Sequence, residues 1–264
     1  MGPSTTTDPA RGLRLSLETV RQTSGFIEPV HARRATWLSL ATLLRRAACP
    51  HLDIQPQELV AGVHGAAGQG PSPVYAFLAD TLDNGAGYST HLASSPEELE
   101  KYLQRVEEYV ADLELPQHAL ECNASCYQCL RDYTNMTAHA LLDWRLARDL
   151  LNILRGRNLD IDSEWHQKLL VSWAKDAAAE ILLTDSGGAA IYTGGDWGDS
   201  EVVVVAKYPL EAADSLAGPR LRNLDAAVRG TRPGIQAIVF VDDFLLDRTP
   251  SAVTASVEAF SAKL

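Results

Sequence analysis

Three of the four cysteines lie within eight residues, at Cys122, Cys126 and Cys129. The last two are separated by two residues, and a turn of that length lets two thiolates reach one metal ion. No stretch has the pattern of a signal peptide or the roughly 18 consecutive apolar residues of a membrane helix, so we expect a cytoplasmic protein. Thiols stay reduced in that compartment, and the cluster therefore predicts a bound metal rather than disulfides.

A closed structural zinc site has four ligands, so the cysteine cluster requires one more. We predict zinc as the cofactor, with the ligands Cys122, Cys126, Cys129 and His139. His118 and Cys49 are the alternatives for the fourth ligand. A competing interpretation is that the cysteines are buried thiols without a metal. Bound zinc would keep the thiolates deprotonated and join the end of one helix to the start of the next.

The charge balance limits how such a chain can meet nucleic acid. Its 23 basic residues stand against 34 acidic ones, which gives a formal net charge of −11. Proteins that bind nucleic acid alone usually have a basic face, because phosphate neutralisation supplies much of the affinity. The basic clusters here are sparse: Arg33/Arg34, Arg45/Arg46 and Arg145/Arg148. We therefore expect any DNA contact to be shared with a basic partner.

The apolar periodicity predicts a first domain over residues 11–158, after a disordered lead-in at residues 1–10. Its expected elements are strands at 12–20, 58–63 and 74–78, and helices at 35–48, 95–113 and about 139–155. Pro50 is expected to end the first helix, and Ser95 to cap the second. The predicted fold class is α/β, a mixed sheet with helices and a cysteine-rich zinc knuckle.

A glycine-rich turn, Asn84-Gly-Ala-Gly-Tyr88, follows the third expected strand. Backbone amides at such a turn can receive an anion. No lysine or hydroxyl residue stands at the spacing of a phosphate-binding loop, so a structural turn is favoured. Asp80, at the end of that strand, can bind a cation or cap a backbone group, and capping is the commoner role.

A second, small α/β domain is predicted over residues 162–264. We expect helices at 164–182, 218–228 and 250–264, and strands at 189–192, 202–206 and 235–240. This order is similar to that of the restriction-endonuclease-like core, whose members hold a metal with an Asp and a Glu-x-Lys pair. The nearest match is Asp199, Glu201 and Lys207, but Val205 stands where a carboxylate is required. The pattern favours a structural or degenerate nuclease-like domain over an active nuclease.

A longer series of motifs resembles a known family. Asp80-x4-Gly85-Ala-Gly-Tyr88 is followed by a helix, by Cys122-x3-Cys126-Tyr-x-Cys129-Leu-Arg-Asp-Tyr133, and by Leu142-Asp143-x-Arg145. Over residues 12–155 this order resembles the MrfA-type zinc-binding domain. Members of the MrfA branch have a fourth cysteine shortly after the pair, near the place of Met136 here. Defence-type members are more similar to this chain, with a histidine where His139 stands.

The resemblance implies a function that the residues alone do not. Such domains lie at the C-terminus of superfamily-two DEAD/DEAH helicases of the MrfA and Hrq type, and in anti-phage systems of the DISARM and Druantia kind. The implied protein is an accessory or detached C-terminal part of a DNA helicase complex, in DNA repair or anti-phage defence. Its implied partners are a DEAD/DEAH helicase subunit and DNA. The chain has no G-x4-G-K-[ST] motif, so we expect no ATP hydrolysis and no catalysis by this chain alone.

Two other functions compete with this one. The order of elements in the second domain suggests a metal-dependent nuclease, although the missing carboxylate argues against it. The cysteine cluster also suits a standalone zinc-dependent DNA-binding or redox-sensing protein, although the acidic charge argues against strong binding of DNA.

Overall fold

The computed structural model divides into two compact units. One is Arg34–Leu159, here called the cysteine unit, and the other contains Asp160–Leu264, here called the C-terminal unit. The structure describes residues 30–65, 74–81, 86–159, 161, 163–184, 187–193, 201–211, 218–233, 235 and 237–262. The predicted lead-in at 1–10 and the predicted strand at 12–20 lie outside these residues. The limits 11–158 and 162–264 stay predictions of separately folding domains.

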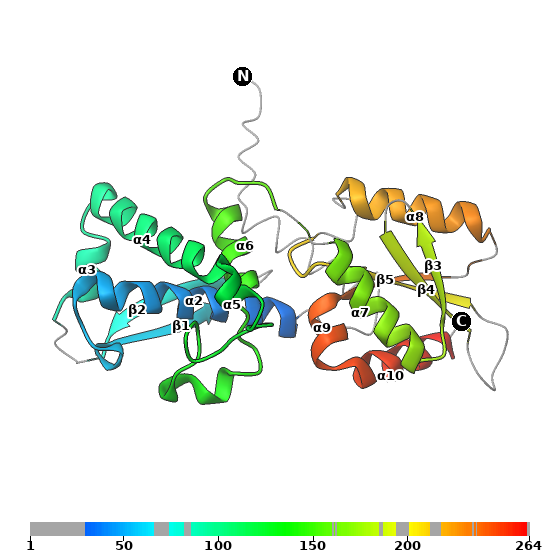
Figure 1. Ribbon diagram of the computed structural model, residues 1–264, viewed down its shortest axis with the longest axis horizontal. Helices are drawn as coiled ribbons and strands as arrows, with labels where there is room; N and C mark the ends of the chain where they lie inside the picture. Colours follow the sequence, from blue (N-terminus) through cyan, green and yellow to red (C-terminus); the bar gives the residue numbers. More distant parts are fainter. Residues whose placement is uncertain are drawn as a thin grey trace, which may run out of the picture. The chain divides into compact units, whose positions relative to one another are not determined.

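The elements of the cysteine unit follow one another along the chain, as Figure 1 shows. They are α2 (Val30–Leu52), the 3-10 helix η1 (Pro56–Glu58), β1 (Leu59–Gly65), β2 (Val74–Asp80), α3 (Tyr88–Leu92), α4 (Pro96–Glu114), α5 (Pro116–Ala119), the 3-10 helix η2 (Tyr133–Ala138) and α6 (Trp144–Leu154). β1 and β2 form an antiparallel two-stranded sheet. In the described part of the chain, no helix is long and apolar enough to cross a membrane.

The helix predicted to end at Pro50 continues to Leu52. A proline near a helix end removes one backbone hydrogen bond, and the preceding residues here keep the helical path. The helix ends instead at Asp53, which has a φ of 56°. The next amide, of Ile54, donates to the Cys49 carbonyl at 3.0 Å, which satisfies one of the last carbonyls of α2.

The sheet of β1 and β2 requires a glycine at one position. Gly62 pairs with Phe77 across the two strands. A Cβ atom at Gly62 would lie 2.7 Å from Cζ of Phe77, so the ring of Phe77 covers the backbone of β1 at this point. Close approach of a side chain to backbone is a common reason for glycine in a strand.

Two helices of the cysteine unit begin where a side chain caps them. Ser95 accepts a hydrogen bond from the Glu98 amide at 3.2 Å and Pro96 follows it, as the sequence predicts. The helix predicted from about His139 begins only at Trp144. The Asp143 side chain accepts from the Arg145 amide at 2.9 Å and fixes this later start. Residues before it form the separate turn η2.

The C-terminal unit is a four-stranded mixed sheet with helices on both faces (Figure 1). Its elements are α7 (Ser163–Asp176), β3 (Glu180–Thr184), β4 (Gly187–Thr193), β5 (Glu201–Lys207), α8 (Pro219–Thr231), β6 (Ala237–Asp242), α9 (Asp243–Arg248) and α10 (Pro250–Ser261). The strand order is β3-β4-β5-β6, with β3, β4 and β5 antiparallel and β6 parallel to β5.

The predicted helix at 164–182 is wrong in its last third. It ends at Asp176, Ala178 has a φ of 53°, and Glu180–Thr184 forms the edge strand β3. The strand was missed because Glu180-Ile-Leu-Leu continues the apolar pattern of the helix. The short helix α9 was also not predicted. The likeness to a restriction-endonuclease core rests on the order of elements and stays a prediction.

The apolar run of β5 is explained by burial on both faces of the sheet. Val202, Val204 and Ala206 pack in a core that includes residues of α7 and α10. Val203 and Val205 pack in a second core with Leu221 and other residues of α8. A strand covered on both faces is apolar at successive positions instead of alternating. The two cores and the two sheets confirm the predicted mixed α/β class.

Candidate metal centre

Four ligand side chains meet in the cysteine unit. One ligand atom each of His118, Cys122, Cys126 and Cys129 lies within 4.8 Å of all the others. Sγ of Cys129 is 3.8 Å from Sγ of Cys122 and 3.6 Å from Sγ of Cys126. Nε2 of His118 is 3.6 Å from Sγ of Cys126. Tetrahedral zinc with Zn–S bonds of about 2.3 Å has S···S edges of about 3.8 Å and S···N edges of about 3.5 Å. The donor set therefore fits a zinc ion.

Short local turns bring these side chains together. α5 carries His118, and its carbonyl accepts from the Cys122 amide at 2.9 Å. The Cys126 carbonyl accepts from the amides of Cys129, at 3.2 Å, and Arg131, at 2.9 Å. The Cys126 amide in turn donates to Sγ of Cys129 at 3.0 Å. An amide that donates to a thiolate is the expected stabilisation of a two-residue metal knuckle.

The ring of His118 is held with one nitrogen toward the thiols. Its Nδ1 lies 2.8 Å from the Leu113 carbonyl, at the end of α4. An Nδ1–H that donates to this carbonyl leaves the lone pair of Nε2 free to bind a metal, which is the usual outer support of a histidine ligand. The ring also lies edge-on to Trp144, with centroids 5.4 Å apart. His118 is thus oriented by the ends of two helices.

The electrostatics of the three thiols favour a bound cation. Burial raises the pKa of Cys122 and of Cys129, and the neighbouring sulfurs add to the rise at Cys122. At Cys126 burial also acts to raise the pKa, but hydrogen bonds with the Gln128 amide and His118 outweigh it and lower the pKa. The surroundings favour one thiolate and oppose the others. A divalent cation would supply the charge that lets all three ionise.

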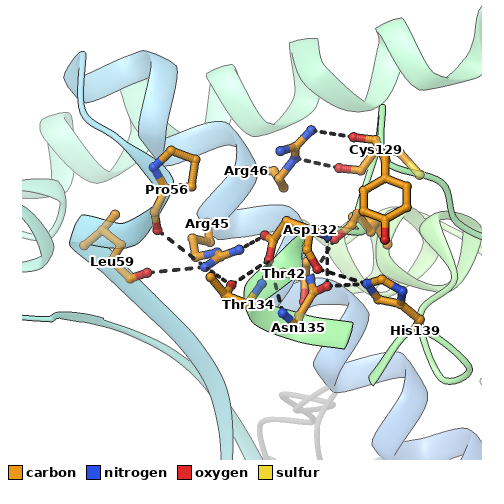
Figure 2. A network of polar contacts seen from close by, with 12 residues as sticks. Thr42, Arg45, Arg46, Pro56, Leu59, Cys129, Asp132, Thr134, Asn135 and His139 are labelled. Carbon is orange, nitrogen blue, oxygen red and sulfur yellow. Dashed lines mark hydrogen bonds and ion pairs between the residues drawn. The ribbon is translucent and has the colours of Figure 1, made fainter. Parts of the chain in front are cut away.

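His139, the predicted fourth ligand, is not brought to the cluster. Its Nε2 lies 3.0 Å from the Asp132 carbonyl and 2.9 Å from Oδ1 of Asn135 (Figure 2). The turn η2, which Asp132 caps, places His139 beside its own loop. His118, the alternative, occupies the fourth position. His118 stands four residues before Cys122, a spacing that places two side chains on the same side of one helical turn. This spacing could have indicated His118 as the fourth ligand. The other alternative, Cys49, is buried in α2 outside the cluster.

Arginines hold the backbone of the loop that carries the cysteines. Arg46 of α2 donates through Nε to the Cys129 carbonyl at 2.7 Å, and Figure 2 shows this contact. Arg145 of α6 donates to the carbonyls of Ala119, Cys122 and Asn123 at 3.1, 3.1 and 2.6 Å. Neither residue was predicted to have this role, because arginine–carbonyl contacts have no local sequence pattern.

A buried ion pair connects α2 to the turn η2 (Figure 2). Arg45 is nearly fully buried and pairs with the carboxylate of Asp132. Its Nη1 also donates to Oγ1 of Thr134 at 3.0 Å. Asp132 accepts from the amides of Thr134 and Asn135 at 2.7 and 3.1 Å, so one carboxylate serves both the arginine and the turn. The segment after the cysteines is therefore fixed to the helix core.

The other sequence candidates have structural roles or lie outside the described residues. Asp80 accepts from the Tyr88 amide at 2.9 Å and from the Ser89 hydroxyl at 2.6 Å, which is a capping role. Asn84 and Gly85 of the glycine turn lie outside the described part.

The nuclease pattern is not assembled by the residues that suggested it. Glu201 and Lys207 stand at opposite ends of β5, about 20 Å apart at the rise of a strand. Nζ of Lys207 is instead bound to Asp242 of β6. Asp199 lies outside the described residues. Glu201 and Lys207 are too far apart to act at one nuclease centre.

The comparison with family models agrees with the geometry. Residues 40–130 match the model of the MrfA Zn-binding domain. This segment is an MrfA-type zinc-binding domain. It contains His118 and all three clustered cysteines and ends before His139, so the match is shorter than the resemblance seen at 12–155. The domain and its cluster identify zinc as the ion. No curated protein and no solved structure matches the chain.

Proposed function

We propose that this chain is an accessory zinc-binding part of a DNA helicase complex, with a superfamily-two DEAD/DEAH helicase as its partner. The observation that carries the proposal is the match to the MrfA Zn-binding domain over the segment that holds the four ligands. The chain has no phosphate-binding motif of a helicase motor, so the partner would hydrolyse ATP. The chain would contact DNA as part of the complex.

In this proposal zinc has a structural role. The ligands are Nε2 of His118 and the three Sγ atoms, and four protein ligands leave no position open for a substrate. The ion would join the end of α4, which orients His118, to the start of α6, whose Arg145 holds the same loop. The zinc site would thereby stiffen the surface that the module presents to its partners.

The ligand set is tested by metal content. We expect about one zinc per wild-type chain, by elemental analysis of protein purified without chelator. Cys126→Ser and His118→Ala should lose zinc, whereas His139→Ala should retain it. His139→Ala is the matched control, because both histidines lie in the same segment and only His118 faces the thiols. Loss of zinc from His139→Ala alone would contradict the ligand set.

The partner is tested by purification from the source cells. A tagged wild-type chain should recover a subunit with DEAD/DEAH helicase motifs, at a stoichiometry that survives gel filtration. The zinc-free Cys126→Ser chain should not recover it. A well-folded, zinc-loaded chain that elutes alone would contradict the helicase proposal while leaving the zinc site intact.

The biological setting follows from the same family and needs a separate test. The process served would be DNA repair or anti-phage defence. Deletion should raise sensitivity to DNA-damaging agents in the first case, and raise phage plating efficiency in the second. Normal survival in both assays would contradict both settings.

A further inference from the structure

Beside the zinc ligands, a group of aromatic and apolar side chains is open to solvent. Tyr127 is 55% exposed, Tyr133 is 84% exposed and Met136 is 57% exposed. The ring centroids of Tyr127 and Tyr133 are 5.9 Å apart, and the ring of His139 stands edge-on to Tyr127 at 5.6 Å. These four residues are called the aromatic face. Exposed aromatic side chains that cluster mark interaction sites more often than exposed ones that stand singly.

The backbone of the aromatic face is held in place by arginine side chains of α2. Tyr133 is the first residue of η2, whose cap Asp132 is paired with buried Arg45. Tyr127 lies between two zinc ligands, and Arg46 donates to the carbonyls on either side of Gln128, at 3.3 Å to Tyr127 and 2.7 Å to Cys129. The rings therefore need little ordering when a ligand binds, which favours affinity.

The charge near this face differs from that of the whole chain. Among the described residues, Arg46, Arg131 and Arg145 have no carboxylate within ion-pair distance. Their guanidinium groups bind carbonyls or the Ser125 hydroxyl of the cysteine loop instead. Arg155, by contrast, is paired with Glu100 and Glu107.

These arginines offset the acids of the loop region without forming ion pairs with any described residue. Asp132 is neutralised by Arg45. Three arginines then stand against Glu121, Asp143 and the single negative charge of a zinc ion with three thiolates, so the loop is close to neutral although the whole chain is acidic. Burial lowers the pKa of His139, and the charge of Arg131 lowers it further, so at least one cation stands beside the aromatic face. Exposed rings with an arginine beside them, in a loop without excess negative charge, suit a nucleic-acid strand, because bases stack on aromatic rings and phosphates bind arginine.

We propose that the aromatic face binds single-stranded nucleic acid, with bases stacked on Tyr127 and Tyr133 and the phosphates near Arg131. The proposal deepens the proposed function, because it names the surface through which the module would contact DNA, but it does not depend on a helicase partner. A single strand fits because its bases expose their faces, whereas those of a duplex are stacked on one another. The net charge of −11 makes binding weak and strongly dependent on salt.

The test is fluorescence anisotropy with the zinc-loaded full chain and labelled 15-mers of dT and rU at low salt. Wild type should bind the single strands, and bind an unlabelled hairpin duplex competitor less well. Tyr127→Leu and Tyr133→Leu should each weaken binding by about 5- to 150-fold, from the usual worth of one base–aromatic stack. Arg131→Gln should lower the slope of log affinity against log salt by about 0.7.

Tyr75→Leu is the matched control. Tyr75 is 54% exposed, close to the exposure of Tyr127, but lies on β2 away from the cysteines in the sequence. The Tyr75→Leu variant should bind the single strands as wild type does, and every variant should keep one zinc ion per chain. Equal weakening of binding by Tyr75→Leu, or unchanged binding by both Tyr127→Leu and Tyr133→Leu, would overturn the proposal.

Failure here can be told apart from failure of the helicase proposal. No anisotropy change with wild type at low salt overturns the nucleic-acid face. If a helicase subunit still co-purifies, and Tyr133→Leu abolishes that association, the face binds protein instead. Preference for rU over dT would keep the proposal and assign RNA as the source of the strand. Binding of dT without any helicase partner would keep the face and reject the accessory role.

Discussion

The cysteine unit and the C-terminal unit both bury charged side chains, but the partners of those side chains differ. In the cysteine unit, Arg45 binds Asp132 and Thr134, and Arg46 and Arg145 bind backbone carbonyls. In the C-terminal unit, Lys207 is paired with Asp242 at the ends of two parallel strands, yet Oδ2 of Asp242 has no hydrogen-bond partner in the described part of the chain.

His166 and Asp243 continue that cluster in the C-terminal unit. Nδ1 of His166 lies 3.1 Å from Oδ2 of Asp243, at ion-pair distance, but the angle does not make a hydrogen bond. Both side chains are almost fully buried. The cysteine unit thus uses its polar groups to hold a metal loop, while the C-terminal unit carries an incompletely satisfied ionic cluster beside two apolar cores. The first unit should depend on zinc, and the second on its sheet.

The largest expected effect is the loss of zinc, which should separate the two units. Cys129→Ser removes a ligand that contacts two others. Zinc binding in small domains is worth about 10–16 kcal/mol and is coupled to folding. We expect amide protection to collapse over 116–143 and to persist in β4, β5 and β6, measured by hydrogen exchange with mass spectrometry. Loss of protection in both units would show that their stabilities are linked.

The next effect concerns the buried pair of the C-terminal unit. Lys207→Met should destabilise that unit by about 3–5 kcal/mol, because it leaves the Asp242 carboxylate buried without a cation. The double variant Lys207→Met/Asp242→Leu should recover most of the loss. Urea unfolding followed by NMR cross-peaks of β5 measures both. Lys175→Met is the control, since Lys175 is exposed on α7 and should change little. Zinc content should stay the same in all three variants.

A smaller effect is expected for the ion pair of the cysteine unit. Arg45→Met should cost about 1–3 kcal/mol, because Asp132 keeps the hydrogen bonds of η2 and lies nearer to solvent than Asp242 does. The loss should appear as faster exchange in η2 at unchanged zinc stoichiometry. A loss as large as that of Lys207→Met would remove the contrast between the two ion pairs.

The smallest effect is a difference in pH dependence. Burial raises the pKa of Asp243, and the neighbouring His166 only partly opposes this. An acid whose folded pKa is raised contributes stability below its unfolded pKa, and this contribution is lost as pH rises through the folded pKa. Zinc ligands behave in the opposite way, because protons compete with the metal as pH falls.

We therefore expect a fall in pH to weaken the cysteine unit, and a rise in pH above the unfolded pKa of Asp243 to weaken the C-terminal unit. Asp243→Asn should flatten the pH dependence of the C-terminal unit. Urea midpoints read separately from NMR cross-peaks of α4 and β6, over the range from acid to neutral pH, measure this. If the urea midpoint read from β6 still depends on pH in the Asp243→Asn variant, that dependence belongs to another titrating group.

Local patterns were sufficient for much of the fold. The start of α4 at Ser95, the strands β1 and β2, and the apolar strand β5 follow from capping residues, alternation and a continuous apolar run. Patterns failed where a tertiary partner decides between alternatives. The apolar pattern of Glu180–Thr184 predicts a helix, but pairing with β4 makes this segment a strand. The start of α6 depends on the Asp143 cap and not on the apolar spacing before it.

The sequence by itself predicted a metal site and the three thiols that would belong to it, because their spacing in one short loop favours metal binding over most other roles. It did not decide the fourth ligand, since His118 and His139 both lie within reach along the chain. The tertiary structure decided this: α4 ends so that Leu113 turns His118 toward the thiols, while Asp132 and Asn135 hold His139 away. It alone placed Arg46 and Arg145 around the loop, because contacts between residues more than twenty positions apart leave no trace in local spacing.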